Sequence, residues 1–360
     1  MLEKALLEYE KYPRVTVVMA VYNAAQFLHQ AVVSVLSQTY GNFELVVVDD
    51  CSSDDSFAIL QAFNDCRIQI IRQNKNLGAA QARNAALSVA RGEFIAIMDA
   101  DDVCLPTRLA AQISFLDEHP EVGLIGCRSY ENIGTDGNIL CTTELPEDNE
   151  TIQRMMLEKW CFLHSSIMFR RNLQALVGGY HQLFEPVEDH DFVLRLLERS
   201  EGRNPHERLV SYRLNPKGLS VVGLPYVSEL RRLAVRTAKR RRSNQPEGFN
   251  HELTRILALK EKRTSWGLLS RVRQRWVHSF YAAHRYYGFG CDAFCSGDLE
   301  QARRCFVQSL RANVAFVKSW IGLVASGLPA FASYLRFMFL PSGQQRRDND
   351  LYPFSPQNRI

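Results

Sequence analysis

Three aspartates, Asp99, Asp101 and Asp102, directly follow the apolar run at residues 94–98. The run is typical of a buried strand, so the carboxylates should lie where that strand ends. Carboxylates two residues apart can converge on a hard divalent cation, and Mg²⁺ or Mn²⁺ held in this way keeps positions for water and substrate phosphates. The pattern suggests a metal and diphosphate site. The alternative is an acidic turn in which Asp102 caps the next helix.

A second acidic cluster ends another apolar run, where Asp49 and Asp50 follow residues 46–48. A carboxylate in this position can hydrogen-bond a ribose or the N–H of a base, although Ser52 or Ser53 can also simply cap the following helix. The segment 76–84 (NLGAAQARN) adds a glycine at a helix start and an arginine, Arg83, that can meet phosphate or base oxygens. We expect these loops to form one nucleotide-sized site.

A third acidic group, Glu188-Asp189-His190-Asp191, begins a predicted helix in the second half of the chain. The helix dipole favours acidic residues in a first turn without any further role. A carboxylate there could also take a proton from a hydroxyl group. The residues alone leave both interpretations open.

The elements that would position these groups alternate along the first part of the chain. Strands are expected at 14–21, 43–50, 67–74, 93–102 and 122–126, with helices at 24–38, 53–63, 78–92 and 105–120. This alternation calls for parallel strands and right-handed crossovers, hence an α/β sheet with helices on both faces. Ligands of such sheets gather at the carboxyl ends of the strands.

Beyond Gly126 the alternation fades, although 151–160 and 190–200 still look helical and 209–214 looks like a strand. The sheet is expected to continue with a less regular edge. Long helical stretches follow Pro216, including 226–242, 251–263 and a helical hairpin at 293–314. The predicted organisation is an N-terminal extension (1–13), a catalytic domain (14–220, divided into 14–126 and 127–220), a helical module (221–341) and a disordered tail (342–360).

Composition indicates an ordinary globular chain of 360 residues with 46% hydrophobic content. Nine cysteines without zinc spacing indicate reduced thiols, and no thiolate metal site is expected. The chain shows neither an apolar leader nor a long uncharged apolar run, so we expect a cytosolic protein without a membrane span.

Charge is distributed unevenly. Before Ser220 the chain has 20 basic and 30 acidic residues, whereas from Ser220 onward it has 23 and 9. A basic C-terminal part could bind anionic lipid, a polyanion or nucleic acid, or it could be a solvated helical surface. No nucleic-acid motif accompanies it. Besides a solvated surface, the hypothesis is peripheral contact with the inner face of the cell membrane, through basic residues that include Arg231, Arg232, Arg236 and the run 239–242.

The motifs VTVVMAVYNAAQFL, LVVVDDCSSDDS, NLGAAQARN and GEFIAIMDADD occur in order over about the first 125 residues. Together they resemble the N-terminal half of the inverting glycosyltransferases of family 2, which have the GT-A fold. The resemblance implies a Rossmann-like, mostly parallel sheet, here followed by the basic helical module. It also implies a nucleotide-sugar donor, UDP-linked in our interpretation, and Mn²⁺ or Mg²⁺.

Carried over position by position, the resemblance also assigns the site residues. It implies nucleotide contacts for Ala20, Tyr22, Asp50, Arg83 and Asp99, and metal ligation by Asp101 together with Asp99. Asp102 remains open between ligand and helix cap.

On the acceptor side, EPVEDHDFVLRLL resembles the family's Glu-Asp-x-Asp motif, which makes Asp189 the base that deprotonates the acceptor hydroxyl. The candidate contacts to acceptor or diphosphate are Asp102, His164, Glu188, Asp191 and Arg213. His164 could instead be a core or capping histidine. Asn215 stands where many relatives have a histidine, which leaves the third protein ligand of the metal open, and Arg213 or Lys217 could then neutralise the diphosphate.

The implied reaction is transfer of a sugar to a saccharide, lipid-linked or other hydroxyl acceptor, in the synthesis of cell-envelope polysaccharide, glycan or glycolipid. A Rossmann oxidoreductase is disfavoured because no G-x-G-x-x-G follows Val21. A non-catalytic protein, either a nucleotide-sugar binder or a helical scaffold, is the alternative from another class.

Overall fold

Seven strands form the main sheet of the computed structural model, which describes residues 12–215, 225–246, 283, 286–291, 293–294 and 298–312. β9 runs antiparallel to both of its neighbours, and the other pairs are parallel. The mostly parallel sheet expected from the sequence is therefore confirmed. The order across the sheet is β10 (Glu201–Arg203), β6 (Val122–Ile125), β9 (Met168–Arg170), β4 (Phe94–Asp99), β1 (Val15–Val21), β2 (Phe43–Asp49) and β3 (Ile68–Arg72).

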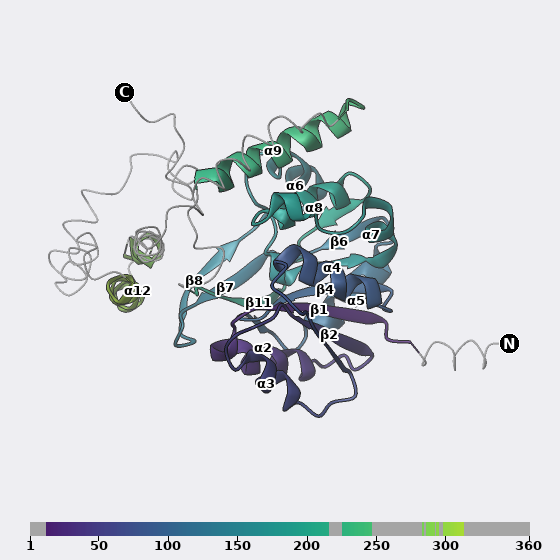
Figure 1. Cartoon of the computed structure of the whole chain (residues 1–360). Coiled ribbons are helices and arrows are strands. Elements are labelled where there is room, and N and C mark those ends of the chain that lie inside the picture. Colours follow the sequence, from purple (N-terminus) through teal and green to yellow (C-terminus); the bar gives the residue numbers. More distant parts are fainter. Residues whose placement is uncertain are drawn as a thin grey trace, which may run out of the picture. The chain divides into compact units, whose positions relative to one another are not determined.

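Helices cover both faces of this sheet, because successive strand residues point to opposite sides. Val17 and Met19 of β1 are buried in one core with α2 (Ala25–Leu36) and α5 (Arg108–Glu118). Val18 is buried in a second core with α4 (Ala79–Val89) and α8 (Glu188–Leu197). Figure 1 shows α2 and α3 (Ser56–Gln61) below the strands and α6 (Asn149–Met155) and α8 above them.

The strand order switches at β1. β2 and β3 lie on one side of β1, whereas β4 lies on its other side. In the sheet register Ala20 pairs with both Val48 of β2 and Asp99 of β4. Ligands of open α/β sheets bind in the crevice that such a switch opens at the carboxyl ends of the strands. This edge is therefore where the functional side chains should be sought.

A second sheet of four strands takes the place of the continuous edge that the sequence suggested. Its order is β5 (Val103–Cys104), β11 (Arg208–Arg213), β7 (Ser129–Ile133) and β8 (Ile139–Glu144). The main sheet continues only through the short strands β9 and β10. The second sheet brings the segment around Arg213 against the loop that follows β4, because β11 pairs with β5.

The helix α9 (Pro225–Arg242) packs on the outer side of α8, where Leu230, Leu233 and Ala234 are buried. Arg241 adds hydrogen bonds of 2.7, 2.8 and 3.1 Å to the carboxylate of Glu198, which follows α8. The sequence placed α9 in a C-terminal module. In the structure it shares a core with the main sheet and lies in the first of two compact units, residues 1–278 and 279–360.

In the second unit, α12 (Leu299–Ala312) buries Ala302 and Phe306 together with Ala293 and Phe294. None of the helices in the described residues is both long and apolar enough to cross a bilayer. Several predictions lie outside the described residues: residues 1–11 of the extension, the helix at 251–263, Lys217 and the tail.

Candidate active site

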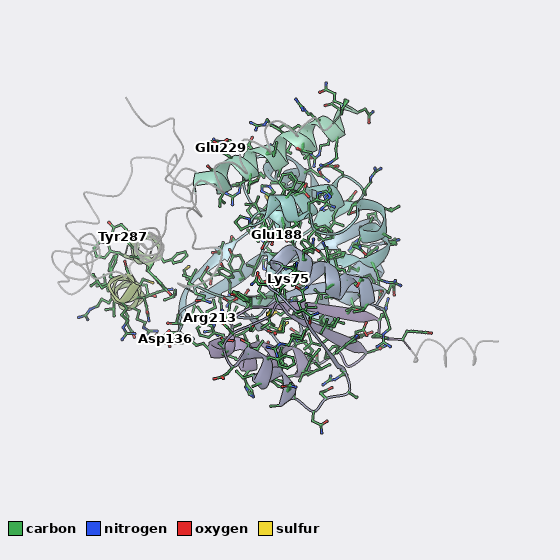
Figure 2. All side chains as sticks on the ribbon, in the orientation of Figure 1. Lys75, Asp136, Glu188, Arg213, Glu229 and Tyr287 are labelled. Atoms are coloured by element: carbon green, nitrogen blue, oxygen red, sulfur yellow. The ribbon has the colours of Figure 1, made fainter. Side chains whose placement is uncertain are left out.

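The structure brings together Arg83, Asp99 and Glu188, which come from three separate segments. The Arg83 guanidinium donates to Asp99 Oδ1 at 3.1 Å and to Glu188 Oε1 at 2.7 Å. Its side chain is 11% exposed. Arginine presents a planar set of donors that suits two carboxylates at once. Glu188, which is labelled in Figure 2, is the first residue of α8 and is buried.

The two carboxylates that share Arg83 differ in their pKa shifts. Burial raises the pKa of Glu188 above its usual value, although the charge of Arg83 opposes the rise. Burial also acts to raise the pKa of Asp99, but His164 and Arg83 outweigh it and hold this pKa well below the usual range. Asp99 therefore stays ionised at the end of β4.

Asp101 lies beside Asp99 and is held by Asn215, whose Nδ2 donates to Asp101 Oδ2 at 2.9 Å. Burial raises the pKa of Asp101 to about 6 against this hydrogen bond, and the charge of Asp99 adds to the rise. The crowding of two carboxylates is relieved by a cation, so this pair fits a hard divalent metal. In the described part of the chain, no three His, Cys, Asp or Glu side chains converge on a metal position, so other ligands would have to complete the shell.

Glu188 and Asp189 lie in the first turn of α8, at the same edge of the sheet. Asp189 is half-buried, and its Oδ1 accepts a hydrogen bond of 2.7 Å from the backbone N–H of His190. A partly exposed carboxylate beside Glu188 is available to a ligand in the crevice.

Asp50 is buried below the loop that precedes α4. Its two oxygens accept hydrogen bonds of 2.8 Å from the backbone N–H groups of Leu77 and Gly78. Burial raises the pKa of Asp50 against these bonds. Each oxygen retains a second lone pair, so a base contact remains compatible with this arrangement. Tyr22, at the end of β1, is 52% exposed and offers a ring at the same edge.

Three predicted contact residues are buried and already hold parts of the protein together. Asp102 accepts hydrogen bonds from Ser165 Oγ and, at 2.7 Å, from the backbone N–H of Arg213. The Arg213 guanidinium donates to the carbonyl groups of Asp101 and Gly134, at 2.8 and 3.0 Å. These contacts link the loop after β4 to the second sheet. They do not support the expectation that Asp102 or Arg213 contacts acceptor or diphosphate.

Asp191 is the third of these residues. It is fully buried and forms ion pairs with Arg195 at 2.9 Å and with His181 at 2.8 Å. Both contacts help to hold α8 in place, and the carboxylate of Asp191 is not directed toward a ligand. The expected acceptor contact of Asp191 is therefore not supported by its position, because a fully buried side chain offers no surface to a substrate.

His164 lies at the site, although it is 7% exposed. Its Nε2 is 3.0 Å from the hydroxyl of Tyr180, and its Nδ1 is 3.9 Å from Asp99 Oδ1. The sequence left a core position and a site position as alternatives for His164, and in the structure the side chain is both buried and close to Asp99. Nothing in the sequence around Tyr180 marks it as a site residue, yet its hydroxyl group meets His164. Its guanidinium neighbour, Arg83, lies 5.5 Å from the ring centre.

Comparison with known proteins agrees with this geometry. The model of the family described as Glycosyl transferase family 2 matches residues 16–175. A glucosyltransferase of Escherichia coli, named UDP-Glc:alpha-D-GlcNAc-diphosphoundecaprenol beta-1,3-glucosyltransferase WfaP, is 42% identical over 188 residues, which cover 52% of this chain and 71% of that protein. The chain belongs to glycosyl transferase family 2.

Two further comparisons agree with this assignment. The putative glycosyltransferase EpsE of Bacillus subtilis is 32% identical over 209 residues, which cover 56% of this chain and 73% of EpsE. Among solved structures, S. aureus TarS 1–349 in complex with UDP-GlcNAc shares the fold, with a TM-score of 0.50 and 16% identity over 90% of this chain and 92% of that chain. The GT-A fold expected from the sequence is confirmed.

Proposed function

We propose that this glycosyltransferase moves a sugar from a UDP-linked donor to an acceptor hydroxyl with inversion at the anomeric carbon. The observation that carries the proposal is the Arg83 bridge. It joins Asp99, at the end of the donor-side strand β4, to Glu188, which precedes Asp189 on α8. One guanidinium thus links the carboxylate proposed for the leaving-group side to the residue next to Asp189, the proposed base.

Asp99 and Asp101 are the residues that would hold Mn²⁺ or Mg²⁺, which would neutralise negative charge on the departing diphosphate. Their support is the chemistry of the pair: burial raises the pKa of Asp101, and the nearby charge of Asp99 adds to the rise. Asn215 holds Asp101 in place. Ala20, Tyr22 and Asp50 would contact the nucleotide at the neighbouring strand ends.

Asp189 would accept the proton of the acceptor hydroxyl. The acceptor oxygen then forms its bond to the anomeric carbon, while the bond from that carbon to the diphosphate oxygen breaks and its electron pair leaves with the nucleoside diphosphate. A single displacement of this kind inverts the anomeric configuration. Asp189 is suited to the task because its carboxylate lies in the first turn of α8 and is only half-buried.

The acceptor is proposed from the relatives. The E. coli relative is named for transfer to a sugar linked through diphosphate to undecaprenol, and another relative, ExoO of Rhizobium meliloti, is named for succinoglycan biosynthesis. We infer that this chain acts on a lipid-linked saccharide in the assembly of an envelope polysaccharide or glycolipid.

The proposal is tested with purified protein, UDP-sugars, Mn²⁺ and a lipid-diphosphate-linked saccharide. We expect a UDP-sugar to be consumed with release of UDP, a product of inverted anomeric configuration by NMR, and loss of both on addition of EDTA. Retained configuration would contradict the displacement by Asp189. Absence of nucleotide binding and of UDP release with every donor would instead favour the non-catalytic alternative.

The outer face of α9 supports a proposal about where the enzyme works. Its apolar face is buried against the domain, whereas the basic residues Arg232, Arg236, Lys239 and Arg240 are exposed at helical spacing. We propose that this basic face lies against an anionic membrane surface that contains the lipid-linked acceptor. Each basic side chain near such a surface contributes about 1 kcal/mol.

The double change Arg236→Glu with Arg240→Glu tests this membrane contact in a flotation assay. Because two attractive charges become repulsive, we expect binding to vesicles containing anionic lipid to fall by more than about tenfold. The charge-matched control, Arg303→Glu with Arg304→Glu, alters exposed residues of α12 and should float like the wild type. Equal binding of the wild type to neutral and anionic vesicles would contradict the proposal.

A further inference from the structure

Residues 180–188 lead directly into Asp189, and they lie along one side of α4. Several hydrogen bonds hold this segment, including two made by the side chain of Gln182. At its start, Asn84 forms hydrogen bonds with the main chain of Tyr180. In its middle, the backbone N–H of Ala79 donates to Glu185 Oε1 at 2.9 Å. At its end, Arg83 donates to Glu188. The segment that carries the proposed base is therefore fixed by the helix that also carries the donor-side arginine.

Asn84 makes the first of these contacts with both the oxygen and the nitrogen of its side-chain amide. Asn84 Oδ1 accepts a hydrogen bond of 2.7 Å from the backbone N–H of Tyr180, and Asn84 Nδ2 donates to the carbonyl oxygen of Tyr180 at 2.8 Å. One planar group with one donor and one acceptor thus fixes the position and the direction of a single peptide segment. The close approach needs a glycine at 179, because a Cβ there would overlap Asn84 Oδ1.

The main chain that Asn84 holds also sets the ring of Tyr180. The ring is 2% exposed, contacts the Arg83 guanidinium at 5.5 Å and places its hydroxyl 3.0 Å from His164 Nε2. Arg83 and His164 both lie beside Asp99. A shift of this main chain would therefore move groups on the donor side and the base on α8 relative to each other.

We propose that Asn84 is a positioning residue for sugar transfer, which holds the segment leading into Asp189 at a fixed place relative to the donor carboxylates. This inference rests on the proposed function. Asn84 does not touch the reacting atoms in this role. It acts through the main chain of Tyr180, so its loss should reduce the rate of transfer rather than the affinity for the nucleotide.

The test uses the full chain with Asn84→Asp, measured for UDP binding by calorimetry and for steady-state transfer. The carboxylate keeps the acceptor for the Tyr180 N–H but sets an oxygen against the Tyr180 carbonyl oxygen, which repels it. Because displacement of a reacting group by about 1 Å can cost about 100-fold in rate, we expect kcat to fall by about that factor while the Kd for UDP with Mn²⁺ stays unchanged. Asn84→Ala, which removes both bonds without adding charge, should show the same split.

Ser88→Ala is the matched control, because Ser88 is exposed on the same helix and bonds only its own turn, at the carbonyl oxygen of Ala85. It should leave both quantities unchanged. A wild-type kcat in both Asn84 variants, or a loss of UDP affinity that parallels the loss of rate, would overturn the positioning role. A wild type that transfers no sugar from any donor would overturn the proposed function itself.

Discussion

Replacing Asp189 with asparagine should abolish sugar transfer while leaving donor binding intact. The change keeps the size of the side chain but removes the carboxylate that we propose accepts the acceptor's proton. Loss of a general base costs about 10²–10⁴-fold in rate, so we expect kcat to fall by at least about 10²-fold. The N–H of His190, which donates to Asp189 Oδ1, retains an oxygen acceptor in the asparagine variant, so the start of α8 should keep its structure.

The measurement compares initial rates of UDP release in the presence of acceptor with the Kd for UDP in the presence of Mn²⁺. Glu150→Gln is the matched control, because Glu150 is an exposed acidic residue in the first turn of another helix, α6. It should transfer sugar at the wild-type rate. Transfer by Asp189→Asn at a rate close to that of the wild type would exclude Asp189 as the base.

Replacing Asp101 with alanine should abolish transfer for a different reason, by removing metal-dependent binding of the nucleotide. Asp99 would be left as the single carboxylate of the proposed pair. Stabilisation of the leaving group by a metal contributes several kcal/mol, so we expect kcat/KM to fall by about 10³-fold. The increase in UDP affinity that Mn²⁺ gives the wild type should disappear in the variant.

Titrations of UDP with Mn²⁺ and with EDTA measure this difference directly. Glu207→Ala, which removes an exposed carboxylate before β11, is the control and should keep the response to Mn²⁺. The two active-site variants should differ in their response to the metal. Asp189→Asn should keep the increase in UDP affinity with Mn²⁺ that Asp101→Ala loses. If UDP binds Asp101→Ala as tightly with Mn²⁺ as it binds the wild type, Asp101 is not a metal ligand.

The sequence by itself determined the main sheet and the edge at which the site lies. The periodicities of strands and helices are local, and a parallel sheet places the carboxyl end of every strand on one side. The strands expected around residues 14–21, 43–50, 67–74, 93–102 and 122–126 are all present. Asp50 and Asp99 could therefore be assigned to one crevice without coordinates.

The tertiary structure alone decided which side chains meet. Arg83 and Glu188 are 105 positions apart, and the main chain of Arg213 bonds Asp102 across 111 positions. No local pattern specifies a hydrogen-bonding partner at that separation, because the partner depends on how separate segments pack. The sequence thus identified Arg83 as a candidate site residue, but not its bridge between two carboxylates. It also could not show that Asp102 and Arg213 are buried and hydrogen-bonded to each other.

The same reason accounts for the second sheet and for α9. β11 joins strands whose residues lie about 80 to 110 positions earlier in the chain. The helix α9 buries its apolar face on α8 despite a strongly basic composition. Composition records how many charges a helix has, whereas packing decides which face of it remains exposed. For this protein, local periodicity fixed where the catalytic chemistry can occur, and long-range packing decided which carboxylates remain available to perform it.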